Sequence, residues 1–75
     1  MARPLRLAFG DAVRAARQEQ GISQEALGHL SGLHRNHVGE IERGELSPTV
    51  DSIDLLAKAL KVRPSELMER AEGLR

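Results

Sequence analysis

The chain has 75 residues, enough for one domain with a small core and too few for two. It has no cysteine, which excludes disulfides, thiolate metal sites and cysteine nucleophiles, and its only aromatic residue is Phe9, which argues against recognition of single strands by base stacking. Eleven basic residues balance eleven acidic ones, and a neutral total predicts modest non-specific affinity for nucleic acid.

The N-terminal part of the chain predicts a first helix from Leu7 to about Gln20. Phe9, Val13 and Ala16 fall on one apolar stripe of this helix, with arginines on either side of the stripe. Gly21 follows and is a typical residue for ending a helix.

A second, short helix is expected after Ser23, which is a favourable N-cap residue. Leu27 and Leu30 form an apolar i, i+3 pair on it. The triplet Ser31-Gly32-Leu33 then has room for a tight turn, because Gly32 accepts a backbone conformation that other residues avoid.

A third helix is expected between Leu33 and Gly44, and Val38 and Ile41 repeat the i, i+3 spacing on it. His34 would occupy its N-cap, which predicts a less well capped start than serine, threonine or aspartate would give. Two short helices joined by such a turn have the geometry of a helix-turn-helix, in which the second helix stands out far enough to enter a DNA major groove.

A fourth helix is expected to begin after Thr49 and to run to about Leu60. Val50, Ile53, Ala57 and Leu60 share one face, so this helix is predicted to pack against the others and not to bind a ligand.

A fifth helix opens at Pro64, a favoured first-turn residue, and is expected to reach about residue 72. Arg63 precedes it and cannot cap as a serine would, so its start is expected to be ragged. The chain has no strand signal. The predicted fold is therefore an all-α domain of five helices that spans residues 1–75.

Several short segments together carry a family resemblance: SQEALGHLSGL, then IERG, then a proline, then LAKAL. With these segments, residues 8 to about 68 resemble the phage-repressor/Cro-like, or XRE, family of helix-turn-helix proteins. The resemblance implies a lambda-repressor-like fold with the helix-turn-helix at about residues 23–43. It also implies sequence-specific binding of double-stranded DNA and regulation of transcription. The stretch LHRNHVGEIERG further resembles controller proteins that regulate restriction–modification genes.

Three polar residues of the third helix are candidates for reading bases. Arg35 and Asn36 fall in its first turn, and Glu40 lies about one turn further on. Arginine suits guanine, asparagine suits adenine, and glutamate accepts from cytosine. The resemblance implies base contacts at these positions. The alternative is that these polar residues are only exposed to solvent at the start of the helix.

The resemblance also implies contacts to the DNA backbone. Gln24 resembles a glutamine that bonds a phosphate and braces the first residue of the recognition helix, and Arg43 resembles a second phosphate contact. His37 matches a position near the backbone. Arg17 and Glu42 resemble a family ion pair that joins the first helix to the third, and Arg17 is also expected to reach a phosphate.

The C-terminal segment suggests self-association. Leu67, Met68, Ala71 and Leu74 recur at i, i+1, i+4 and i+7, a stripe wider than one small core requires. We expect Leu67 to pack inward against the fourth helix, and Met68, Ala71 and Leu74 to form a homodimer interface. A dimer would place two recognition helices on a palindromic operator.

Other functions have weaker support. An antitoxin that binds a partner protein and regulates its own operon is the main alternative. His34, His37 and Glu40 have a spacing at which zinc ligands could nearly converge, but they coincide with the DNA-facing helix, so we expect no metal. No catalytic arrangement, cofactor or small-molecule ligand is indicated. No apolar run or leader points to a membrane, so a cytoplasmic protein is expected.

Overall fold

The computed structural model describes residues 2–75, and within this range it contains five α-helices and no strand. The predicted all-α fold is confirmed. The helices are α1 (Leu5–Glu19), α2 (Gln24–Ser31), α3 (Arg35–Glu42), α4 (Val50–Ala59) and α5 (Pro64–Gly73).

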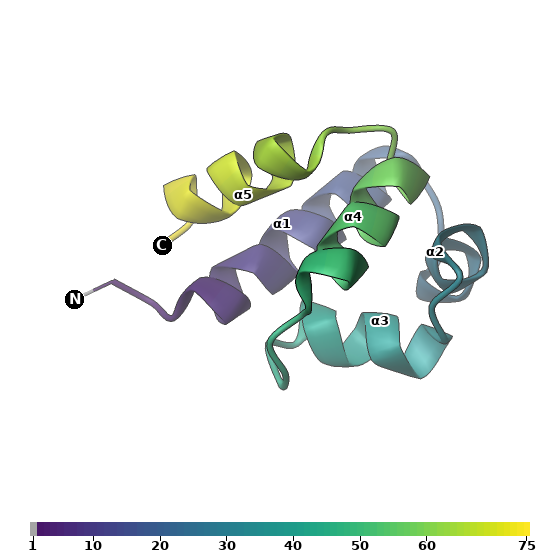
Figure 1. Cartoon of the computed structure of the whole chain (residues 1–75), viewed down its shortest axis with the longest axis horizontal. Coiled ribbons are helices and arrows are strands. Elements are labelled where there is room, and N and C mark those ends of the chain that lie inside the picture. Colours follow the sequence, from purple (N-terminus) through teal and green to yellow (C-terminus); the bar gives the residue numbers. More distant parts are fainter. Residues whose placement is uncertain (1) are drawn as a thin grey trace.

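The helices pack around α1, which runs through the middle of the molecule (Figure 1). α5 lies alongside α1, and α3 packs against α1 through its last turn, where Ile41 and Glu42 lie against Gly10. α2 packs against α3 and α4, which completes the helix-turn-helix at the end of the molecule away from the two termini. The fifth helix therefore packs chiefly on α1 and less extensively on α4.

The core receives apolar side chains from all five helices. Phe9 is its one aromatic member, and most of its volume is aliphatic. The large, fully buried apolar side chains are Phe9, Val13, Leu27, Val38, Ile41, Leu56, Leu60 and Leu67.

Two predicted N-caps are confirmed. The Oγ atom of Ser23 accepts a hydrogen bond from the Ala26 N–H at 3.0 Å, and Oγ1 of Thr49 accepts one from the Ser52 N–H at 3.0 Å. These bonds satisfy N–H groups that have no partner within the helix.

The expected weak starts of α3 and α5 are not observed, although Arg63 makes no side-chain cap, as predicted. Nδ1 of His34 accepts a hydrogen bond from the Asn36 N–H at 3.0 Å, so the imidazole takes the place of a shorter capping side chain. At α5, the Glu66 carboxylate accepts a hydrogen bond from the Arg63 N–H at 3.2 Å. Glu66 is the third residue of the helix, so its side chain caps the helix start in place of the N-cap side chain.

Two residues of the apolar sets named from the sequence lie at the surface. Leu30 is 60% exposed, because α2 buries the face that contains Leu27, Gly28 and Ser31. Val50 is 82% exposed although Ala57 and Leu60 on the same face are buried, because it is the first residue of α4 and the other helices do not cover that end of the face.

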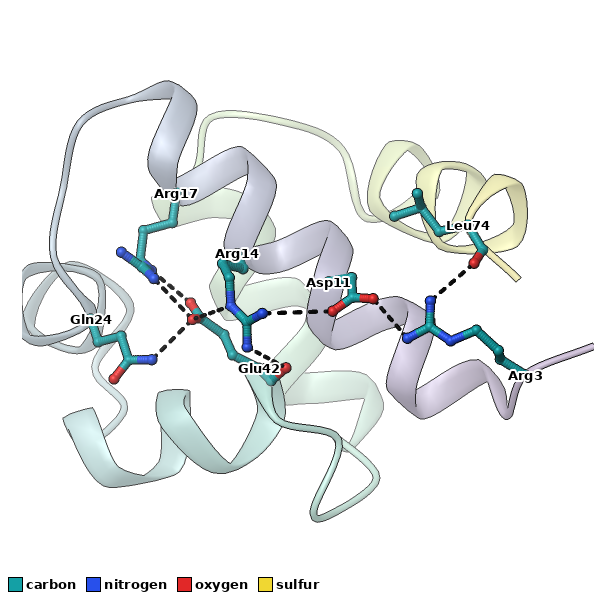
Figure 2. A network of polar contacts seen from close by, with 7 residues as sticks. All are labelled: Arg3, Asp11, Arg14, Arg17, Gln24, Glu42 and Leu74. Carbon is teal, nitrogen blue, oxygen red and sulfur yellow. Dashed lines mark hydrogen bonds and ion pairs between the residues drawn. The ribbon is translucent and has the colours of Figure 1, made fainter.

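The two ends of the described chain lie next to each other. The Arg3 guanidinium donates to the Leu74 carbonyl oxygen at 3.2 Å and to the Asp11 carboxylate at 2.7 Å (Figure 2). The Arg75 side chain donates in return to the Arg3 carbonyl oxygen at 3.1 Å. These contacts hold the end of α5 against the start of α1.

The longest helix in residues 2–75 is α1, and neither it nor any other helix there combines the length and apolar character needed to cross a membrane.

Candidate nucleic-acid interface

Two glycines in helix interiors bring the helices around α3 close together, and the sequence pattern alone did not single them out. A Cβ atom at Gly28 would lie 2.7 Å from the Leu33 carbonyl oxygen and 3.0 Å from the Arg35 nitrogen. A Cβ atom at Gly10 would lie 2.6 Å from the Glu42 carbonyl oxygen. Only glycine therefore fits where α2 meets the start of α3 and where α1 meets its end.

A buried ion pair links α1 to the end of α3. Nε and Nη2 of Arg17 donate to the two carboxylate oxygens of Glu42 at 2.7 and 3.0 Å (Figure 2). Nη1 of Arg17 donates to the Ile22 carbonyl oxygen at 3.0 Å. The Glu42 side chain is 0% exposed and that of Arg17 only 13%. The structure thus brings together the two residues that resemble the family ion pair, and the expected phosphate contact of Arg17 stays a prediction.

Two further side chains complete the surroundings of Glu42. The Gln24 amide donates to its carboxylate at 3.0 Å, and Arg14 donates to its carbonyl oxygen at 3.2 Å (Figure 2). Arg14 also approaches Asp11, which in turn accepts from Arg3. A continuous line of polar contacts therefore runs from the end of α5 to the end of α3.

The charge on Glu42 is stabilised by these contacts. Burial by itself raises the pKa of Glu42, but the hydrogen bonds from Arg17 and Gln24 and the positive charges of Arg17 and Arg14 outweigh it, so that the pKa of this carboxyl lies below its ordinary value. The hydrogen bond to Glu42 likewise raises the pKa of Arg17. Both groups are charged at neutral pH.

A pH dependence of stability follows from the lowered pKa of Glu42. Its contribution is fully present above the unfolded value of 4.5 and is lost as the pH falls through the lower pKa of the folded state. The difference in free energy of unfolding between the wild type and Glu42→Gln should therefore be constant near neutral pH and shrink below about pH 4.5. Urea denaturation at a series of pH values measures it. A difference that stays unchanged down to about pH 3 would contradict this assignment.

The predicted base-reading residues lie on the open side of α3. Arg35 and Asn36 are exposed and Glu40 is half-buried, and all three line an open groove of about 700 Å³ that runs from the start of α2 along α3 to the loop after it. Arg35 forms an ion pair with Glu25 of α2 at 3.1 Å, which the sequence did not predict. The groove therefore presents guanidinium, amide and carboxylate groups together.

The residues predicted to meet the DNA backbone have different surroundings. Gln24 bonds Glu42, so in this structure it braces the end of α3 and not its first residue, Arg35. Gly39 leaves room for the Arg43 guanidinium, because a Cβ atom there would lie 2.8 Å from Nη1 of Arg43. Arg43 is exposed, and His37 is half-buried on α3.

Arg43 is paired in the structure, with a residue that the sequence reasoning had not considered. Its Nε and Nη2 donate to the two carboxylate oxygens of Glu45 at 2.7 and 3.1 Å. These hydrogen bonds raise the pKa of Arg43 and lower that of Glu45. Both residues line the same groove.

The structure corrects the predicted dimer surface in one respect. Ala71 is 0% exposed and belongs to the core between α5 and α1, so its place in an interface between subunits is wrong. Leu67 is buried, as expected. Leu74 is 44% exposed, and Met68 is half-buried beside a small cavity that Phe9 also lines.

The residues of the metal hypothesis do not converge. No group of three potential metal ligands comes together anywhere in residues 2–75. His34 instead uses Nδ1 to cap α3.

Comparison with known proteins places the chain in a family. The helix-turn-helix family model matches residues 13–67. The control protein C.BamHI of Bacillus amyloliquefaciens is 39% identical over 70 residues, which are 92% of this chain and 86% of that protein. The control protein C.SmaI of Serratia marcescens is 41% identical over 63 residues, 84% of this chain and 74% of that one.

Solved structures agree with this placement. The restriction–modification controller protein C.AhdI from Aeromonas hydrophila superposes with a TM-score of 0.81 and 44% identity over 83% of this chain and 94% of that one. The P22 c2 repressor, solved in complex with a synthetic operator, superposes with a TM-score of 0.73 and 34% identity over 79% of this chain and 89% of that one. The chain therefore belongs to the XRE-type helix-turn-helix family of DNA-binding transcriptional regulators.

Proposed function

We propose that this protein is a controller-type regulator that reads an operator sequence by placing α3 in the major groove. The observation that carries the proposal is the exposure of Arg35 and Asn36 at the start of α3, on a helix whose other end is locked to α1 by the Arg17–Glu42 ion pair. A rigid helix with a polar first turn is what base recognition requires. The name control protein, shared by relatives about 40% identical, supports the narrower role.

Each proposed base contact has a distinct chemistry. Arg35 can donate two hydrogen bonds to guanine, and Asn36 can pair with the edge of adenine. Glu40 is half-buried one turn along and can accept from cytosine. Arg43 and the start of α2 around Gln24 would fix the position of the protein on the phosphates, with His37 near the backbone.

Arg35→Ala tests the base contacts. Loss of a bidentate contact should weaken binding to a selected operator by about 1–3 kcal/mol and relax the preference at one base pair. A fluorescence anisotropy titration on the operator and on single-base variants of it measures both effects. The matched control is Arg63→Ala, which removes an exposed arginine at the start of α5. Equal effects of the two substitutions would contradict the assignment of Arg35.

We also propose that the protein binds as a homodimer on an operator whose half-sites lie about 34 Å apart, one turn of DNA. Support comes from the small core, the limited reach of one short recognition helix and the exposed Leu74 at the end of α5. With Ala71 buried, the proposed surface consists of Leu74 and Met68.

Leu74→Glu should shift the monomer–dimer equilibrium toward the monomer, because dimerisation would bury a carboxylate. Sedimentation velocity at micromolar concentration measures this shift, and Leu30→Glu, at an exposed leucine of α2, is the matched control. A wild-type monomer that protects a single, unrepeated half-site in footprinting would rule out the dimer.

The antitoxin alternative has no support from the relatives reported above, which are transcription regulators. A regulator of this family acts where the DNA is, and we propose that it works in the cytoplasm.

A further inference from the structure

The arginine proposed to contact a phosphate already holds a carboxylate. Arg43 follows the last residue of α3, and Glu45 lies two residues further along the loop. Two parallel hydrogen bonds of 2.7 and 3.1 Å join the guanidinium to the carboxylate, and the two side chains are 52% and 53% exposed. The hydrogen bond from Arg43 holds the pKa of the Glu45 carboxyl below its usual value, so this partner is ionised at neutral pH.

The position of this pair matters because it lies on the surface that DNA would cover. Arg43 and Glu45 line the groove that also contains Asn36 and Glu40. Carboxylate and phosphate both bind the same planar edge of a guanidinium group through two hydrogen bonds. Arg43 therefore cannot offer that edge to Glu45 and to a phosphate at the same time.

We propose that Glu45 is an affinity-setting residue that competes with the DNA backbone for Arg43. The inference rests on the proposed DNA-binding function. In the free protein the Nε–Nη2 edge of Arg43 stays with Glu45, and a phosphate gains this edge only by displacing the carboxylate. The free energy of the intramolecular pair is thus subtracted from that of the phosphate contact. On unrelated DNA, where α3 does not fit closely into the major groove, Arg43 remains paired with Glu45. It then neutralises no phosphate, and no counterion is released from the DNA on its account.

This competition makes two quantitative predictions for Glu45→Gln, which keeps the size of the side chain and removes its charge. Affinity for the selected operator should rise by about two- to five-fold, the range expected when an exposed ion pair no longer has to be broken. On unrelated duplex DNA, the slope of log K against log salt concentration should steepen by up to about one, because Arg43 becomes free to neutralise a phosphate.

A double-mutant cycle separates the competition from a simple change of charge. The wild type, Glu45→Gln, Arg43→Gln and the double variant are titrated with the selected operator and with an unrelated duplex over one series of salt concentrations. Glu69→Gln, at an exposed position of α5, gives the same change in net charge away from the groove. The expected result is that Glu45→Gln raises affinity in the wild-type background and loses most of this gain when Arg43 is absent.

Three results would overturn the inference: an equal gain in both backgrounds, a gain no larger than that of Glu69→Gln, or an Arg43→Gln variant with wild-type affinity. In each of these cases a wild type that still prefers its operator leaves the proposed function standing. A wild type that prefers no duplex over unrelated DNA would overturn the proposed function and this inference together.

Discussion

Replacing Arg17 by methionine is expected to lower the free energy of unfolding by about 3–5 kcal/mol, a large part of the stability of a domain of this size. The reason is the environment of Glu42, whose side chain has no exposed surface and depends on Arg17 for two hydrogen bonds of 2.7 and 3.0 Å. Methionine keeps much of the apolar packing but leaves the buried carboxylate with Gln24 and the more distant Arg14. Urea denaturation measures the change.

Two variants control this experiment. The double substitution Arg17→Met/Glu42→Met should be more stable than Arg17→Met alone, because no unpaired charge remains buried. Arg43→Met should leave stability nearly unchanged, because its ion pair with Glu45 is exposed. If Arg17→Met is no more harmful than Arg43→Met, the pair does not lock α1 to α3.

The second large effect is expected from Gly10→Ala, which should destabilise the protein by about 3 kcal/mol, the upper end of the range for overpacking. The added Cβ atom would clash with the carbonyl oxygens of Ile41 and Glu42. These are backbone atoms of α3, so the clash cannot be relieved by rotating a side chain. The better helix propensity of alanine, worth about 1 kcal/mol, offsets only part of the clash. A shift of α3 would also move the proposed recognition surface.

Gly73→Ala is the matched control for Gly10→Ala. Gly73 is also helical, but a Cβ atom added there would meet nothing within 4 Å. Stability should stay the same or rise slightly. Thermal unfolding of both variants compares them directly, and a Gly10→Ala protein as stable as Gly73→Ala would show that α1 and α3 have room to separate.

The helices and most of their caps were predictable because their signals are local. Ser23 and Thr49 precede apolar repeats of helical period, and each caps its helix as expected. Periodicity was less reliable for single side chains. Leu30 lies on the apolar side of its own helix by spacing, yet its burial depends on where α3 and α4 lie, which cannot be read from the sequence of α2 alone.

The candidate site was predictable where the family resemblance extended and not beyond it. Arg17 and Glu42 were paired through that resemblance, although 25 residues separate them. The ion pairs of the exposed arginines with Glu25 and Glu45 were not predicted, because the rotamer of a surface side chain cannot be inferred from the sequence.

The close approaches at Gly10 and Gly28 were missed for another reason. Glycine inside a helix is a visible signal, since it weakens the helix, but the element that presses against it can be identified only from the fold. His34 shows the converse, because an imidazole nitrogen took over a capping role that residue preferences assign to other side chains.

Selection of binding sites from random duplexes tests the central claim most directly, with the wild type compared with the triple variant Arg35→Ala/Asn36→Ala/Glu40→Ala. The wild type should enrich one sequence in two inverted half-sites. The triple variant should remain folded and bind the same DNA weakly, with no preference among sequences, because its phosphate contacts survive while its base contacts do not. Enrichment of the same operator by the triple variant, at wild-type affinity, would contradict the assignment of α3 as the recognition helix.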